Sequence, residues 1–542
     1  VKDTSLSFMP IFDWLPSYNW KENLQGDIVA GLTVGIMHVP QGMAHAVLAH
    51  VPPISGLYSS FFASTLYMLF GTSRHISIGS MAVVSMMIGA AQMEYISHDH
   101  TEITNETNVT GPLGDVTPLE LTSALTLAVG IVQFIMALSR LGFITAYLSD
   151  PLVSGFTTGA AFQGLLSQVN KLFGVKLPRY SGTGMAILMI RDIVLDLPNT
   201  NQITLLFSLC GMIFLWVGKD FLVPYVKKYT SIPIPLELIL VIITIIISVT
   251  FNVNEDYGVK IVDTIPKGFP SPSTPQLHLI FDLIFDAIPI AVVCYILIVS
   301  MGKVFAKKHK YRIDAAQEMY ACSFFSSLSS IFPVFPAGTS LSRSVIGEMA
   351  GAKTQLFNLF SSCLLLTVIL YLGPLLEPLP VSILACIIIV NLKSLLMQVN
   401  QLPRLYKISK YDFAIWIVVC SATILCTVAQ GLVIGLSFTI LTIVLREQWY
   451  VSAQTKLSIY ALSQSKLSYF KVLKFNSPLH FANVTTFTDT ITTAMRDMIQ
   501  DGMKKLIIDC SAMHYVDSMG VDAIREAYHD VEELGISIYF VG

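Results

Sequence analysis

The sequence feature that most limits the possible folds of this chain is a series of long apolar stretches with almost no charged residues. The stretch 413–429, for example, contains no Asp, Glu, Lys or Arg. It is long enough to cross a bilayer as a helix, which takes about 17–25 residues. Only 13% of the chain is charged and 53% is hydrophobic, whereas soluble domains carry about 25% charged residues. The sequence therefore predicts a polytopic α-helical membrane protein, and no basic domain suggests a nucleic-acid partner.

The apolar stretches divide into two sets of seven. The first set falls near 26–48, 53–71, 79–95, 118–140, 151–172, 201–218 and 232–251, and the second near 279–304, 315–333, 340–350, 354–373, 378–397, 411–428 and 431–448. The third member of each set is short and is entered through Gly, Ser and Thr. Paired interrupted segments point to a transporter site between inverted repeats. We therefore predict 14 spans arranged as 7+7 inverted repeats.

The stretch 333–347 has the features expected of a half-helix that begins inside the membrane. Two prolines and a glycine precede the expected half-helix and prevent an earlier helix from continuing into it. The hydroxyl residues that follow them are candidate helix caps. The free N–H groups and positive dipole end of such a helix favour an anion. Arg343 adds a full positive charge, which is costly in lipid unless it faces a cavity or ligand. An anion site is one interpretation, and a structural turn with Arg343 reaching a loop is the other.

The loops between spans predict the orientation. The loop 303–312 is strongly basic, and the loop 398–410 carries Arg404, Lys407 and Lys410, so both are expected in the cytoplasm. The loop 96–117 has no Lys or Arg and holds two glycosylation sequons, at Asn105 and Asn108. We predict a plasma-membrane glycoprotein with both termini in the cytoplasm. A glycosidase-dependent gel shift that is absent from the double Asn→Gln variant would test the sequons.

Composition divides the chain into four parts. Residues 1–25 form a polar N-terminal segment with an expected interfacial helix, and residues 26–448 form the membrane domain. Residues 449–466 resemble a linker. Residues 467–542 alternate strand and helix patterns, beginning strand, strand, helix, strand, helix, strand from Phe470. We expect a cytoplasmic α/β domain there that is incomplete, because the chain stops just after a strand.

Several motifs resemble the sulfate permease (SulP, solute carrier 26) family, its animal members most of all. They are VPQGMAHA at 39–46, VPPISGLYS at 51–59, GTSRHISIG at 71–79, SLSRS at 340–344 and GAKTQ at 351–355. The C-terminal runs IIDCS at 507–511 and VDSMG at 516–520 resemble the family's STAS domain. The resemblance implies a core domain of spans 1–4 and 8–11, a gate domain of spans 5–7 and 12–14, an elevator-like motion and a homodimer. It also implies an anion site between spans 3 and 10.

The expected anion-binding residues come from three segments: Ser340, Leu341, Ser342 and Arg343; Ser80, Met81 and Ala82; Gln41 and His45. Two facing half-helix N-termini would make a positive pocket that needs neither metal nor cofactor. His45 has two interpretations: a charged group that favours anions, or a buried neutral histidine paired to a neighbour.

The function predicted from these residues is secondary transport of small anions, of the chloride, bicarbonate, sulfate and oxalate class, by exchange. The run 287–300 has no acidic residue, which argues against proton symport. An uncoupled chloride channel and a voltage-driven membrane motor are the alternatives. No hydrolase motif or nucleotide-binding loop suggests an enzyme. The expected partners are anions, membrane lipid and a second copy of the chain.

Overall fold

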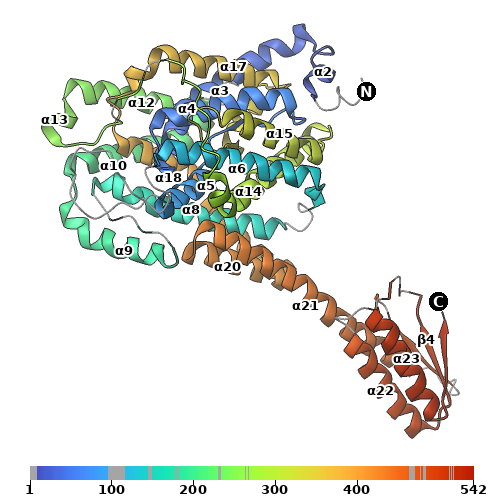
Figure 1. Cartoon of the computed structure of the whole chain (residues 1–542). Coiled ribbons are helices and arrows are strands. Elements are labelled where there is room, and N and C mark those ends of the chain that lie inside the picture. The colour runs from blue at the N-terminus through green and yellow to red at the C-terminus, as the bar shows by residue number, and fades with distance from the viewer. Residues whose placement is uncertain are drawn as a thin grey trace. The chain divides into compact units, whose positions relative to one another are not determined.

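The computed structural model of the chain contains two compact units, Val1–Leu436 and Ser437–Gly542. The residues that it describes are 9–95, 116–143, 149–175, 178, 180, 182–226, 228–229, 234–262, 264–266, 268–462, 470–475, 478–479, 484–511, 513, 515–516 and 518–541. The two sequons at Asn105 and Asn108 lie outside the described residues. Figure 1 shows the helices of the first unit gathered into one bundle.

Every predicted span contains a helix. In the first set these are α3 (Trp20–Leu48), α4 (Pro53–Phe70), α5 (Ala82–Tyr95), α6 (Pro118–Leu138), α8 (Asp150–Phe173), α10 (Gln202–Val217) and α12 (Leu236–Thr250). In the second they are α14 (Leu279–His309), α15 (Ala315–Ser329), α16 (Leu341–Met349), α17 (Leu356–Thr367), α18 (Val381–Leu396), α20 (Lys410–Leu425) and α21 (Val428–Leu462). The arrangement is consistent with 7+7 repeats.

The remaining short helices connect or extend the spans. They are α2 (Ile11–Trp14), α9 (Met185–Asp196), α11 (Val223–Val226), α13 (Val253–Tyr257), α19 (Leu402–Ile408), the 3-10 helices η1 (Leu141–Phe143), η2 (Leu197–Asn199), η5 (Gly373–Leu376) and η6 (Met397–Gln401), and the π-helices η3 (Gly218–Leu222) and η4 (Val368–Leu372). We did not predict α9. α21 continues through most of the expected linker at 449–466.

By length and composition, six of the described helical stretches are able to cross a membrane. They are Pro118–Leu138, Gln202–Val226, Leu279–His309, Leu356–Leu376, Val381–Ile408 and Val428–Leu445. α3 and α8 are long enough but more polar: α3 buries His38 and Gln41, and α8 buries Gln163. Buried spans tolerate such side chains because neighbouring helices, rather than lipid, surround them.

Glycine contacts set the close packing of α3 against its neighbours. A Cβ atom at Gly56 of α4 would overlap the carbonyl of Gly42 in α3. A Cβ atom at Gly31 would likewise overlap the backbone of Phe357 in α17. Small residues at such contacts let helix backbones approach closely, which is how helices associate in membranes without a hydrophobic driving force. The three helices therefore form a tight layer that holds the middle of α3 in place.

Glu318 at the start of α15 joins the two repeats through a buried carboxylate. Its Oε2 accepts from Tyr67 Oη at 2.8 Å, and its Oε1 accepts from the Thr72 N–H and hydroxyl at 2.8 and 2.5 Å and from the Ser73 N–H at 3.1 Å. The side chain is fully buried. Four donors from the end of α4 and the residues that follow it thus converge on this one carboxylate.

Glu318→Gln should lower the apparent melting temperature of the purified protein. An amide has one acceptor oxygen where the carboxylate has two, so some of these buried donors lose their partner, at a cost of roughly 1–3 kcal/mol each. Thermal unfolding in detergent measures the effect. Glu255→Gln, at an exposed position on α13, is the matched control and should leave the melting temperature unchanged. An equal melting temperature for the two variants would contradict the anchoring role of Glu318.

The second unit is an α/β fold with a parallel three-stranded sheet. The strand order is β3 (Lys471–Lys474), β4 (Lys505–Asp509) and β5 (Ser537–Val541), and α22 (Val484–Asp501) and α23 (Ser518–Glu533) are the connecting helices. Leu506 and Ile508 of β4 are buried against both helices' apolar faces. The second strand that we predicted after Phe470 is reduced to an isolated bridge between Leu479 and Val516. The order of the other elements follows the prediction.

Candidate functional site

A two-stranded antiparallel pair brings the two half-helices together. β1 (Ile78–Gly79) pairs with β2 (Gly338–Thr339), with Ile78 opposite Thr339 and Gly79 opposite Gly338. α5 begins three residues after β1, and α16 begins two residues after β2. Because each strand leads directly into a half-helix, the N-termini of α5 and α16 lie near each other. Prolines and glycine before α16 make this extended entry possible, since they oppose a continuous helix.

Arg343 lies at this junction and is fully buried. Its Nη1 donates to Gln41 Oε1 at 3.1 Å, and its Nη2 donates to the Ser80 carbonyl oxygen at 2.9 Å. The guanidinium therefore touches α3 and the entry to α5 while it belongs to α16. Its Nε–H has no partner among the described residues. A buried cation with an unused donor is the chemistry of an anion site.

Ser80 connects the histidine of α3 to the same junction. His45 Nδ1 lies 3.2 Å from Ser80 Oγ, and Ser60 Oγ donates to Ser80 Oγ at 3.3 Å. His38, two turns earlier on α3, places its Nε2 3.1 Å from Ser77 Oγ. Both histidines thus pair with serine hydroxyls. The arrangement favours the interpretation of His45 as a buried histidine paired to a neighbour.

The other predicted residues lie around this cluster. Met81 is buried beside β2, where a Cβ atom added at Gly338 would come within 2.6 Å of its sulfur atom. Ala82 is half-buried, and Leu341 is exposed. Ser340 precedes α16, but its side chain makes no capping hydrogen bond; its hydroxyl lies 3.1 Å from that of Ser342. The structure therefore joins Gln41, His45, Ser80 and Arg343. It leaves five predicted residues outside this bonded cluster: Met81, Ala82, Ser340, Leu341 and Ser342.

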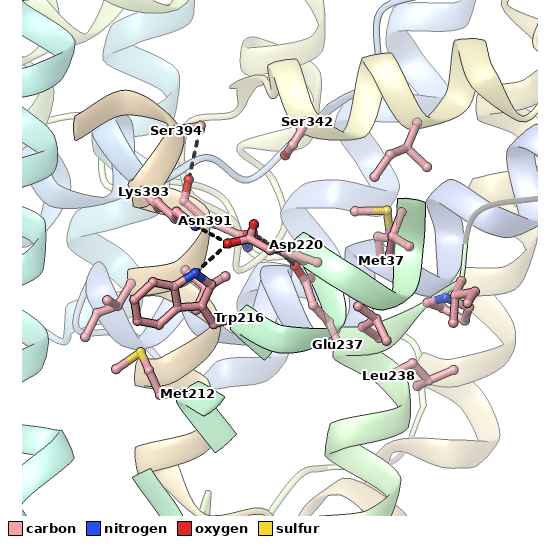
Figure 2. A pocket seen from close by; sticks show the side chains of 18 of the residues that line it. Met37, Met212, Trp216, Asp220, Glu237, Leu238, Ser342, Asn391, Lys393 and Ser394 are labelled. Carbon is pink, nitrogen blue, oxygen red and sulfur yellow. Dashed lines mark hydrogen bonds and ion pairs between the residues drawn. The ribbon is translucent and has the colours of Figure 1, made fainter. Parts of the chain in front are cut away.

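A cavity of about 1040 Å³ reaches the junction along one face of α16 (Figure 2). Ser342, Ile346 and Met349 of α16 line it, at the spacing of one helical face. The remaining walls come from α3, α8, α10, η3, α11, α12, α18 and η6, and from residues 234–235 before α12. We call it the α16 cavity. Arg343 itself does not line the cavity; Gln41 links it to a side chain that does.

That side chain is Glu237, a buried carboxylate in the first turn of α12. Its Oε2 accepts from Gln41 Nε2 at 3.0 Å, and its Oε1 accepts from Lys219 Nζ at 3.0 Å. Lys219 also donates to Asn391 Oδ1 at 2.8 Å. A continuous polar chain therefore runs from Arg343 through Gln41 and Glu237 to Lys219. It crosses from α3 and α16 to η3, α12 and α18.

A second ion pair lines the same cavity. Lys393 Nζ donates to Asp220 Oδ2 at 2.9 Å and lies 5.1 Å from the centre of the Trp216 ring. Trp216 Nε1 donates to the same Asp220 oxygen at 2.5 Å, and Figure 2 shows the lysine and the indole converging on this carboxylate. We call Arg343 and the two ion pairs, Lys219–Glu237 and Lys393–Asp220, the network. It contains three cations and two carboxylates, so one positive charge is in excess.

We did not predict Glu237, Lys219, Asp220, Asn391 or Lys393 as site residues. An acid in the first turn of an apolar helix normally matches the helix dipole, so Glu237 gave no distinct signal. Lys219 and Asp220 follow the predicted span 201–218, where a chain normally enters a loop. The structure instead continues the helix as η3, which keeps both side chains beside the cavity.

Among the described residues, no group of three or more His, Cys, Asp or Glu side chains lies close enough to hold a metal ion. The groups gathered at the junction are hydrogen-bond donors, helix N-termini and paired charges. They can bind and release an anion without a covalent step.

A helical bundle organised around two half-helices and a buried arginine, with a separate α/β unit, defines a polytopic membrane protein. Residues 24–419 match the Sulfate permease family, and residues 464–542 match the STAS domain. The chain therefore belongs to the sulfate permease family, as the motifs predicted. The fold class, a helical membrane domain followed by a STAS domain, is confirmed.

Known relatives agree with this assignment. The chain is 41% identical to prestin of Danio rerio over 452 residues, covering 83% of this chain and 61% of that protein. It is 33% identical to the sulfate transporter of Bos taurus over 593 residues, covering 99% of this chain and 80% of that protein. It also matches the structure of the murine solute carrier 26 family member A9 anion transporter in the inward-facing state, with TM-score 0.89 and 29% identity, over 100% of this chain and 89% of that chain.

Proposed function

We propose that this protein is a secondary transporter of small anions that binds its substrate at Arg343, between the N-termini of α5 and α16. One observation carries the proposal: a fully buried guanidinium with an unused Nε–H lies where two half-helices begin. Both helix ends and the arginine favour negative charge. The family relationship and the description of the murine relative as an anion transporter support this function.

The excess charge of the network suggests which anions fit best. With one unpaired positive charge at the site, a monovalent anion such as chloride or bicarbonate neutralises it without further rearrangement. Sulfate or oxalate would need a second charge, which Lys219 or Lys393 supplies only by leaving its carboxylate partner. We therefore propose monovalent anions as the principal substrates within the predicted class.

Two cavities support alternating access. Besides the α16 cavity, a cavity of about 590 Å³ runs along one face of α5, lined by Met86, Gly89, Ala90 and Met93. We call it the α5 cavity. α5 leads toward the loop 96–117, which is expected outside. Near the end of α16, Glu348 pairs with Lys308 at 2.7 Å. Lys308 belongs to the basic run 303–312, which we expected as a cytoplasmic loop and which the structure forms largely as the last turns of α14. Each cavity would thus open the site to one side of the membrane.

The motion that we propose is an elevator-like displacement of the core against the gate. In helix labels, the family resemblance assigns α3–α6 and α14–α17 to the core, and α8, α10, α12, α18, α20 and α21 to the gate. The Gln41–Glu237 hydrogen bond crosses this boundary, so it would break and re-form during each cycle. Exposed apolar side chains such as Leu206, Ile213 and Ile246 would face lipid or a second copy in a homodimer.

Uptake into proteoliposomes tests the proposal. Radiolabelled chloride, bicarbonate, sulfate and oxalate would be offered outside, with and without anion inside. Exchange predicts uptake that requires internal anion, with the monovalent anions preferred. Uptake without internal anion would favour the chloride channel, and absence of uptake with all four anions would contradict transport. A voltage-driven motor is the second candidate, because the buried Arg343 would move charge in the membrane field; displacement currents without uptake would favour it.

A further inference from the structure

Two serines of α4, one helical turn apart, bond to the extended segment that leads into α5. Ser64 Oγ donates to the Ile78 carbonyl oxygen at 2.5 Å, and Ser60 Oγ accepts from the Ser80 N–H at 3.2 Å. Both serines are fully buried. Backbone groups outside helices need such partners within a membrane, because lipid offers them no hydrogen bond. The two serines therefore hold this segment at two points, and one of them is the residue that contacts Arg343.

Ser60 differs from Ser64 because it bonds to both the backbone and the side chain of its partner. Its hydroxyl accepts from the Ser80 N–H and donates to Ser80 Oγ at 3.3 Å. A hydroxyl on a helix often donates instead to a carbonyl one turn back, as Thr65 Oγ1 does to the Phe61 carbonyl oxygen at 2.7 Å. Among the described residues, the side-chain hydrogen bonds of Ser60 all go to Ser80.

Gly79 gives the Ser60 hydroxyl room to reach Ser80. A Cβ atom at Gly79 would lie 3.1 Å from Ser60 Oγ and 2.5 Å from His38 Cε1. A side chain at position 79 would therefore push away either the serine or the histidine. The contact between α4 and the entry to α5 thus depends on a glycine at the one position where the two segments approach most closely.

Ser80 is the link between Ser60 and the anion site. Its carbonyl oxygen accepts from Arg343 Nη2 at 2.9 Å, and its Oγ lies 3.2 Å from His45 Nδ1. The N–H, the hydroxyl and the carbonyl of a residue are joined through one Cα atom, so fixing the first two restricts the direction of the third. The carbonyl in turn holds the guanidinium, whose orientation decides where its unused Nε–H points.

We propose that Ser60 is a positioning residue of the anion site: it fixes Ser80, and through the Ser80 carbonyl it orients Arg343 for a small anion. The inference deepens the proposed function and rests on it, because it requires the anion to bind at Arg343. Ser60 lines neither the α16 cavity nor the α5 cavity, so it acts through Ser80 rather than by contact with the anion. Ser64 supports the same segment but makes no bond to Ser80.

Ser60→Ala and Ser64→Ala are a matched pair that separates positioning from structural support. In detergent with gluconate in place of chloride, both full-length variants should have a lower melting temperature than wild type, since each loses a buried hydrogen bond. In proteoliposomes, only Ser60→Ala should raise the half-saturating chloride concentration for exchange, by roughly three- to tenfold. An unchanged value in Ser60→Ala, or an equal increase in both variants, would overturn the positioning role.

Combining Ser60→Ala with Arg343→Gln tests the route of the effect. Chloride binding is measured as the chloride-dependent rise in melting temperature. With no guanidinium to orient, the double variant should bind chloride as weakly as Arg343→Gln alone. A further full loss in the double variant would mean that Ser60 acts independently of Arg343, which would overturn the inference and leave the anion site standing. Unchanged chloride affinity in Arg343→Gln alone would instead contradict the anion site, and this inference with it.

Discussion

Replacing Arg343 with glutamine should weaken anion binding by roughly 30- to 1,000-fold without abolishing it. A unit charge close to an anion contributes on the order of 2–4 kcal/mol at an effective dielectric constant near 20. The helix N-termini of α5 and α16 remain in the variant, and each adds about 0.3–2 kcal/mol. Arg343→Lys should fall between wild type and Arg343→Gln, because it keeps the charge but cannot reach both Gln41 and Ser80 as the guanidinium does.

Equilibrium anion binding and half-saturating concentrations for exchange measure this effect. Ser342→Glu should weaken binding further, since it places a like charge on the cavity wall, and its exposed position should leave folding intact. Arg404→Gln, an exposed arginine on α19, is the matched control for loss of a cation. Unchanged affinity in well-folded Arg343→Gln and Ser342→Glu proteins would place the anion elsewhere than between α5 and α16.

Glu237→Gln should bind anions more tightly and exchange them faster. The carboxylate lies within two hydrogen bonds of Arg343, and its charge opposes an anion there by about 1–2 kcal/mol, roughly five- to thirtyfold in affinity. It also makes a charge-assisted bond to Gln41 across the proposed core–gate boundary, which an amide replaces with a weaker one. The variant should therefore lower both the half-saturating concentration and the barrier to motion.

Asp220→Asn separates these two effects. It removes the same charge from the same cavity. Among the described residues, however, Asp220 bonds to Trp216 and Lys393, which lie on the gate helices α10 and α18, and to no core residue. We expect it to tighten anion binding without raising the exchange rate at saturating anion. Equal maximal rates in the two variants would mean that the Gln41–Glu237 bond does not restrain the motion. Unchanged affinity in both would mean that the acids do not influence the site.

The two halves of the site differ in how far the sequence predicts them. The Gly, Ser and Thr entries to α5 and α16 and the lone Arg343 are local signals, and from them we predicted the two half-helices and the arginine. The family resemblance added Gln41, His45 and Ser80, and the structure joins these three residues to Arg343. The gate side depends on contacts that no local pattern encodes. Gln41 and Glu237 are 196 positions apart, and Lys219 and Asn391 are 172 apart. Only the packing of α12 and α18 against α3 brings them together.

Local propensity also failed at particular positions. Ser340 has the residue type and place of a helix cap, yet its hydroxyl turns to Ser342 instead. Lys219 and Asp220 have the character of a loop, yet one wide helical turn keeps them facing the cavity. At Ser340 a local contact with a nearby hydroxyl replaces the cap. At Lys219 and Asp220 the packing of the extended helix outweighs the intrinsic preference, which is a tertiary effect.

The pairing of β1 with β2 has a consequence for biosynthesis. Its two strands belong to opposite halves of the chain, so neither half can form the junction of α5 and α16 by itself. While the first half waits in the membrane for the second to be translated, the backbone groups of Ile78 and Gly79 lack their partners, and Ser80 lacks the guanidinium that will bind its carbonyl. The proposed binding site would therefore be among the last parts of the protein to form, and quality control acting on the nascent chain would encounter it incomplete.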